Sequence, residues 1–169
     1  TAVQNWTARH CIGGVALALL VAVWALARVA MLWPQLLGSA GSALLDWAFL
    51  PLAALVLARP LVQARQWRNL FFVPLLLLMA LLNGLFHLSV AGAIDWELVK
   101  ISHSMVLLVA VVMTIMGGRV IPMFSANGTN TPRVAAIVWL ERVAIASVFV
   151  VFALSLLPQL HPSLAALSF

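Results

Sequence analysis

The chain has 169 residues, of which 65% are hydrophobic and only 8% are charged. A soluble domain carries about 25% charged residues, so this composition excludes a soluble protein and indicates an integral membrane protein. The net charge of +5 does not indicate nucleic-acid binding, because the arginines fall mostly in short segments between apolar runs. The single cysteine, Cys11, excludes a disulfide framework and a cysteine-based zinc or iron–sulfur site.

Five apolar runs each approach the ~20 residues that a helix needs to cross the hydrocarbon core. They cover residues 12–33, 42–57, 70–89, 98–116 and 134–157. The chain lacks the alternating ten-residue pattern of an outer-membrane barrel, so the spans are predicted to be helices. We therefore predict an all-α fold, a single up-down bundle of about five transmembrane helices over residues 1–169.

Charge alternates between the two sides of the predicted bundle. If the chain crosses the membrane five times, one side receives Arg9, Arg59, Arg65, Arg68, Arg119 and Arg133. The opposite side receives an uncharged first loop, the mixed-charge segment 95–100 and an uncharged tail. The positive-inside rule then places the N-terminus in the cytoplasm and the C-terminus outside. Tryptophans near both predicted interfaces are typical of an aromatic belt: Trp33, Trp47 and Trp96 near the outer one, and Trp6 and Trp67 near the inner one.

Ionisable side chains inside a membrane are costly, so each one in a predicted span is a functional candidate. Arg28 and Asp46 are expected at similar depth in the outer leaflet, on neighbouring antiparallel helices joined by a short loop. Three roles fit them: a structural ion pair, an arginine extended to the interface, or contact with an anion or substrate.

Glu141 and Arg142 are adjacent in the fifth predicted span. Adjacent residues point ~100° apart on a helix, so the two cannot both face lipid cheaply and at least one must turn into the bundle. Bonding to neighbouring helices and, for Glu141, a proton or counter-ion role both fit this pattern.

Two histidines lie near the outer ends of the third and fourth predicted spans. His87 has Asn83 one turn before it on the same face, and His103 follows a short outer loop. The two imidazoles are therefore expected at matching depth, where they could ligate haem iron or copper. No HxxxH or ExxH motif strengthens the pair, and a plain hydrogen-bonded histidine is the alternative for each. The sequence shows no catalytic constellation, so enzymatic activity stays open.

The segment GGRVIPMFSANGT, Gly117–Thr129, follows the fourth apolar run. A glycine pair is typical of a helix stop and Asn-Gly is typical of a turn, so we predict a loop at the membrane surface. Asn127-Gly128-Thr129 also matches the glycosylation sequon, but the predicted cytoplasmic side excludes that use.

This segment resembles the signature loop of the NnrS family, which are haem- and copper-containing bacterial membrane proteins of the nitric-oxide response. Ser125 stands where that family commonly has threonine. TAVQNWTARH at 1–10, RNLFF at 68–72 and NGLFHL at 83–88 also resemble the family. The family is larger, with a histidine-rich HAHE-type motif expected before Thr1 and a further histidine-bearing helix expected after Phe169.

The resemblance implies an internal segment of an inner-membrane protein that protects against nitrosative stress, with a cytoplasmic N-terminus and a periplasmic C-terminus. It makes His87 and His103 candidate cofactor ligands, and Arg119 and Asn127 further functional candidates. Haem and copper are expected in the full-length protein. We expect this segment alone to bind haem weakly or not at all, because one or two scattered histidines do not make a pre-organised site. The histidines expected outside it are better ligand candidates.

The expected partners are the lipid bilayer, the remaining helices of the parent protein and, through exposed helix faces, a second copy of the chain. Nucleic acid is not an expected partner. The alternative function is a transporter-like or purely structural transmembrane module without a metal site. In that case Arg28, Asp46, Glu141 and Arg142 would be pathway or packing groups.

Overall fold

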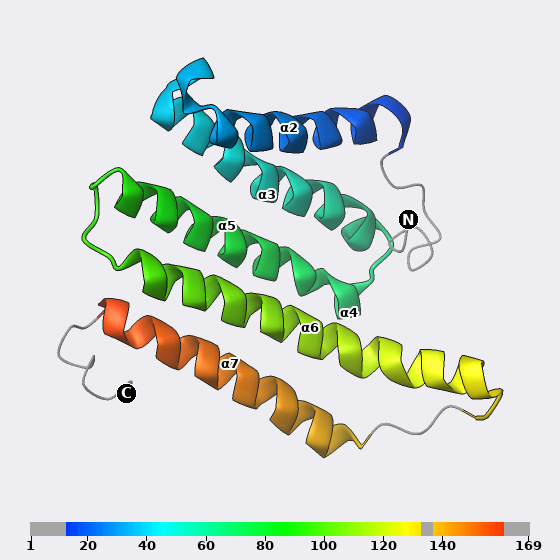
Figure 1. Cartoon of the computed structure of the whole chain (residues 1–169). Helices are drawn as coiled ribbons and strands as arrows, with labels where there is room; N and C mark the ends of the chain where they lie inside the picture. Colours follow the sequence, from blue (N-terminus) through cyan, green and yellow to red (C-terminus); the bar gives the residue numbers. More distant parts are fainter. Residues whose placement is uncertain (1–12, 133–136, 161–169) are drawn as a thin grey trace. The chain divides into compact units, whose positions relative to one another are not determined.

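The computed structural model describes residues 13–132 and 137–160 (Figure 1). Its elements are α2 (Gly14–Leu32), the short 3₁₀ helix η1 (Pro34–Leu36), α3 (Gly38–Gln63), α4 (Trp67–Leu70), α5 (Phe72–Val90), α6 (Leu98–Thr129) and α7 (Val138–Leu160). Within these ranges the chain forms helices and no strand. Five of the helices, α2, α3, α5, α6 and α7, are long and apolar enough to cross a membrane. The all-α fold with five candidate spans is therefore confirmed.

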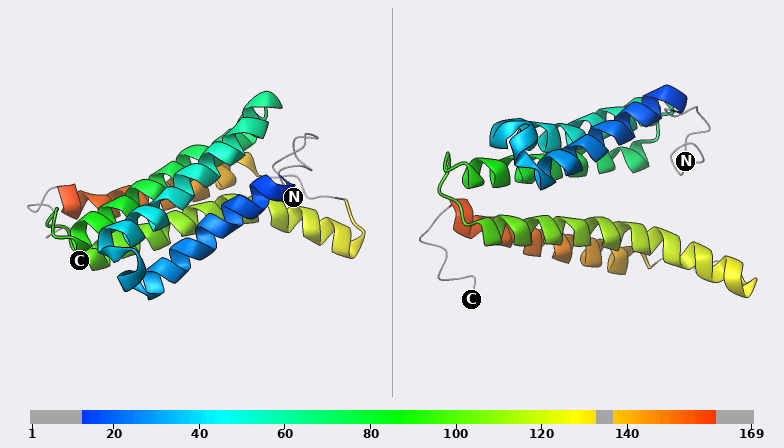
Figure 2. Two further views of the ribbon diagram at one scale, coloured as in Figure 1. Left: turned by 90° about the horizontal axis from the view of Figure 1, so that it is seen from above. Right: turned by 45° about the horizontal axis from the view of Figure 1, so that its top comes forward.

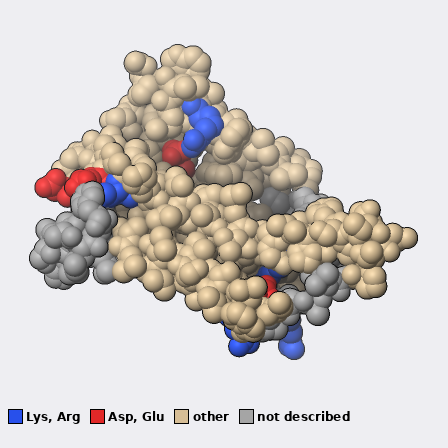
Figure 3. All heavy atoms as spheres, turned by 60° about the horizontal axis from the view of Figure 1, so that its bottom comes forward, with Lys and Arg blue, Asp and Glu red and all other residues tan. Residues whose placement is uncertain are grey.

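The surface of the described residues is that of a multi-pass membrane protein. Charged side chains occupy few places on the face shown in Figure 3. Large apolar side chains such as Val15, Leu55, Val106 and Trp139 are each more than half exposed, on four different spans. Exposure of many large apolar side chains is unfavourable in water, and a bilayer is the solvent that favours it.

Contacts divide the chain into two compact units, residues 1–88 and 89–169. In the first unit, α3 lies between α2 and α5 (Figure 1). In the second unit, α6 packs along α7. The hydroxyl oxygens of Ser104 and Ser155, 3.2 Å apart, join α6 and α7 by a hydrogen bond.

The second span is longer than predicted. α3 covers Gly38–Gln63 rather than 42–57, so Arg59 lies inside the helix rather than in the loop after it. The helix ends only where Arg65 adopts φ +51° and its N–H bonds to the Val62 carbonyl at 3.0 Å. A residue in the left-handed region is a common way to satisfy the last carbonyls of a helix.

The predicted surface loop at Gly117–Thr129 is wrong, because this segment is helical. α6 runs without interruption for 32 residues, which is about 48 Å at 1.5 Å per residue. A hydrocarbon core is about 30 Å thick, so α6 is longer than a perpendicular span needs. Figure 2 shows its C-terminal part, in yellow, continuing past the nearby end of α7. The helix stops at Asn130, which has φ +51°.

The low helix propensity of the residues in Gly117–Thr129 did not prevent this segment from forming a helix. Each interior glycine costs about 1 kcal/mol relative to alanine, but extending an existing helix gains one hydrogen bond per residue. Gly118 also lies against α7, where a Cβ would be 3.7 Å from Glu141 Oε1, so packing supports the helix there. Pro122 removes one helical donor and still lies inside the helix. The fifth span begins at Val138, and its predicted start lies outside the described residues.

A distance measurement tests the continuity of α6. We expect spin labels at Val109 and Asn127, 18 residues apart in one helix, to give a narrow distribution consistent with a backbone separation of about 27 Å. Labels at Val99 and Met113 are the matched control, because both lie in the part of α6 that the sequence already predicts as helix; they should give about 21 Å. All four side chains are exposed, and Cys11 would be replaced by serine first. A broad or much shorter distance distribution for the Val109–Asn127 pair alone would support a loop at Gly117–Thr129 instead.

Candidate functional site

In the first unit, polar side chains from two helices meet one carboxylate on a third helix. Asp46 of α3 forms an ion pair through Oδ1 with Nη2 of Arg28 on α2. Its Oδ2 accepts a hydrogen bond from Asn83 Nδ2 of α5 at 3.0 Å. The same oxygen lies 3.0 Å from Nε2 of His87, one turn further along α5. We call Arg28, Asp46, Asn83 and His87 the polar cluster.

Helix spacing explains how these side chains meet. Residues four apart lie on the same face of a helix, so Asn83 and His87 can both reach one oxygen of a neighbouring helix. The short connection 33–37 makes α2 and α3 neighbours. Ser42 Oγ donates to the carbonyl of Ala30 at 3.0 Å, which ties α3 to α2 near the level of the cluster.

The burial of these groups sets the electrostatics of the cluster. The side chains of Asp46 and His87 are 8% and 13% exposed, whereas that of Arg28 is 52% exposed. A buried carboxylate is costly unless it is paired and hydrogen-bonded. Here Oδ2 has hydrogen-bond partners on α5, whereas Oδ1 has the guanidinium of Arg28 as its ion-pair partner and no hydrogen bond. An ionised Asp46, a charged Arg28 and a neutral His87 give no net charge, which apolar surroundings favour. In that state His87 donates from Nε2, and its Nδ1 keeps a lone pair.

The structure thus brings together Arg28 and Asp46, as their matched depth predicts. Of the three roles that the sequence leaves open for these residues, the structure shows the ion pair. A role in contacting an anion or substrate stays a prediction.

The two candidate cofactor ligands differ in their surroundings. His87 belongs to the first unit and is bonded to Asp46. His103 belongs to the second unit, on α6, and its side chain is exposed. Their matching depth and their role as ligands remain predictions.

Across residues 13–132 and 137–160, no group of three or more His, Cys, Asp or Glu side chains is placed to hold a metal ion. Metal-bound histidines usually give their other ring nitrogen to a carboxylate or carbonyl, as His87 gives Nε2 to Asp46. Only Nδ1 of His87 is then left for a metal or haem iron. The cluster therefore orients one imidazole nitrogen that a metal or haem iron could bind.

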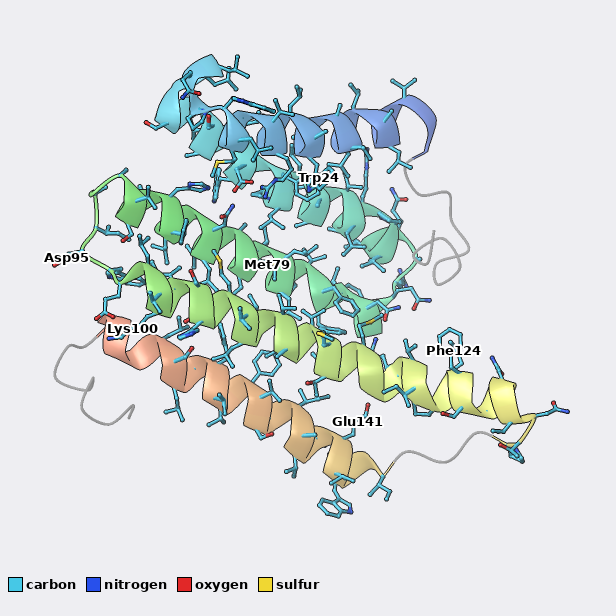
Figure 4. All side chains as sticks on the ribbon, in the orientation of Figure 1. Trp24, Met79, Asp95, Lys100, Phe124 and Glu141 are labelled. Atoms are coloured by element: carbon cyan, nitrogen blue, oxygen red, sulfur yellow. The ribbon has the colours of Figure 1, made fainter. Side chains whose placement is uncertain are left out.

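The remaining candidates lie in the second unit. Glu141 points from α7 toward α6 (Figure 4), where its Oε1 faces Gly118. Arg142 is exposed, so one of the two adjacent charges turns toward the neighbouring helix, as predicted. Arg119 is half-buried and Asn127 is exposed, and both lie on α6 rather than in a loop.

The sequence did not predict one contact of the first unit. Trp47, assigned to the aromatic belt, donates from Nε1 to the carbonyl of Ala80 at 3.0 Å. Its indole also lies close to Gly84, four residues further along α5. The available signal was that glycine, since an isolated glycine in an apolar helix often marks a close approach.

Comparison with known proteins places the chain in a family. The family model described as "NnrS protein" matches residues 1–169, the whole chain. No curated protein and no solved structure matches it.

The ion pair predicts non-additive effects on stability. Removing one partner of a buried pair costs about 3–5 kcal/mol, and the half-exposed Arg28 should reduce this to roughly 1–3 kcal/mol for Asp46→Ala. The variant with both Asp46→Ala and Arg28→Ala should lose less than the sum of the single variants, measured as the midpoint of thermal unfolding in detergent. Asp95→Ala, which removes an exposed loop carboxylate, is the control and should change little. Additive effects at positions 28 and 46 would show that the two side chains do not interact.

Proposed function

This chain belongs to the NnrS family, and we propose that it forms part of a haem- and copper-containing protein of the bacterial inner membrane. In the intact protein it would act in the response to nitric oxide and protect the cell against nitrosative stress. The observation that carries the proposal is the family match across the whole chain. The five apolar spans support it, because a small neutral gas partitions readily into an apolar interior.

Within this function, the polar cluster joins three helices and orients one imidazole. Haem and copper supply the redox and gas-binding chemistry when bound. The contribution of this chain is to place His87 with Nε2 on Asp46 and Nδ1 unused by the cluster, and to present His103 on α6. Both histidines stay proposed ligands, to be completed by ligands beyond those described.

The same cluster also favours the alternative function. Its four side chains bond to one another, and this is what a purely structural or transporter-like module without a metal would show. Metal content separates the two functions, because only the first requires a bound cofactor.

The cofactor test uses the intact protein purified from membranes. We expect a Soret absorption band and copper by elemental analysis, because both cofactors belong to the proposed function. We also expect a strain that lacks the protein to grow more slowly than its parent after addition of a nitric-oxide donor. A purified protein without haem or copper, together with unchanged growth, would favour the structural or transporter-like alternative.

Variants of the same preparation test the two ligands. His87→Gln keeps an amide donor for Asp46 but removes the imidazole. His103→Gln removes the imidazole at the exposed position on α6. If either imidazole is a ligand, its variant should shift or abolish the Soret band. Asn83→Leu is the matched control, because it removes a bond to the same oxygen of Asp46 and leaves both histidines in place. Unchanged spectra and metal content in both histidine variants would assign ligation to other residues.

The proposed orientation of the chain in the membrane is based on where its arginines lie. Arg59 and Arg65 lie at the end of α3, whereas Asp95 and Glu97 lie in the connection before α6. The positive-inside rule then places position 65 in the cytoplasm and position 95 outside. In a Cys11→Ser background, an impermeant thiol reagent added to cells with permeabilised outer membranes should label Asp95→Cys and not Arg65→Cys. The reverse pattern would overturn the orientation.

A further inference from the structure

The indole of Trp47 rests on the backbone of α5 at one turn of that helix. Its Nε1 lies 3.0 Å from the carbonyl oxygen of Ala80. A Cβ added at Gly84 would lie 2.9 Å from Trp47 Nε1 and 3.1 Å from Cδ1. A Cβ atom does not lie this close to other heavy atoms without displacement, so the ring occupies this position because residue 84 has no side chain.

The chemistry of the Ala80 carbonyl explains why the ring needs this position. In an α-helix the carbonyl of residue 80 accepts the N–H of residue 84. A carbonyl oxygen has two lone pairs, so it can accept a second donor from outside the helix. The approach to that second lone pair passes over residue 84. Glycine at 84 therefore opens the carbonyl to the indole N–H.

The contact lies on the same face of α5 as the polar cluster. Ala80, Asn83, Gly84 and His87 follow the i, i+3, i+4, i+7 spacing of one helix face. Two consecutive residues of α3 meet this face: the ring of Trp47 meets it at Ala80 and Gly84, and the carboxylate of Asp46 meets it at Asn83 and His87. Since Asp46 and Trp47 are adjacent in α3, a displacement of the α3 backbone at Trp47 also displaces the Asp46 carboxylate.

We infer that Gly84 and Trp47 are positioning residues that hold the Asp46 carboxylate against His87. The indole on Gly84 sets how α3 lies on α5, and this keeps Asp46 Oδ2 at 3.0 Å from both Asn83 Nδ2 and His87 Nε2. His87 is thereby held in the tautomer that carries its proton on Nε2. This inference goes beyond the proposed function and does not depend on a bound cofactor.

Membrane anchoring does not account for the contact. An anchoring tryptophan directs its N–H to the headgroup region. Trp47 directs its N–H to a helix carbonyl of the same chain, and a neighbouring residue without a side chain makes room for the ring. Both features are those of a helix–helix contact.

The test is ¹⁵N NMR of the full chain in lipid nanodiscs, with the histidines labelled and the His87 signals assigned from their loss in His87→Gln. We expect wild-type His87 to show one predominant tautomer, protonated at Nε2. Trp47→Leu and Gly84→Ala should each convert it to a mixture of tautomers. Trp47→Phe should have an intermediate effect, because it keeps a ring without the N–H. Gly117→Ala is the matched control, since a Cβ there meets Ile121 Cδ1 at an ordinary 3.5 Å.

A combined variant separates positioning from general loss of structure. In a Trp47→Leu background, Gly84→Ala should have almost no further effect on the His87 spectrum or on the thermal midpoint, because the ring that it displaces is gone. If Gly84→Ala prevents folding, Trp47→Leu and Trp47→Phe still report the tautomer. A His87 spectrum that is unchanged in Trp47→Leu would overturn the inference. An equal effect of Gly84→Ala with and without the tryptophan would also overturn it.

Discussion

Burying one carboxylate among apolar helices is the constraint on which the first unit depends. Asp46 is costly in a membrane unless partners surround it, and those partners come from both neighbouring helices. Arg28 balances the charge from α2, while Asn83 and His87 supply donors from α5. Because these bonds are directional and apolar packing is not, the cluster specifies which helix faces meet, a choice that hydrophobic contact alone leaves open. The contact of Trp47 with Gly84 also specifies which faces of α3 and α5 meet, because the indole fits only where α5 has no side chain.

Hydropathy was sufficient to predict the five spans, but not the residues at which their helices begin and end. Five apolar runs of near-spanning length could form only helices in a bilayer, so α2, α3, α5, α6 and α7 followed from composition. The ends of the helices depend on free-energy differences of about 1 kcal/mol between continuing a helix and ending it, and the sequence does not show these differences directly. Gly117–Thr129 carries every local signal of a loop, yet it extends α6, because helix propagation and packing against α7 outweigh those signals.

The candidate site could be predicted only in part. Matched depth on helices joined by a short loop was enough to bring Arg28 to Asp46, since connectivity fixes both neighbours. The bond from Asp46 to His87 joins α3 and α5 and depends on helix rotation, which periodicity does not fix in helices that are apolar all round. The family match shows membership of the NnrS family, and haem, copper and nitric oxide belong to the function that we propose for the intact protein. What the described residues show is one imidazole, that of His87, held by Asp46.

The most direct test of the cluster is a distance across the Asp46–His87 bond in a bilayer. The chain has only two aspartates, Asp46 and Asp95, and four histidines, so ¹³Cγ-aspartate and ¹⁵N-histidine labelling is nearly site-specific. Solid-state NMR should detect a dipolar coupling between Asp46 Cγ and His87 Nε2, because the bonded oxygen and nitrogen are 3.0 Å apart. The coupling should disappear in His87→Gln. Its absence from the wild-type protein would contradict the account of the polar cluster.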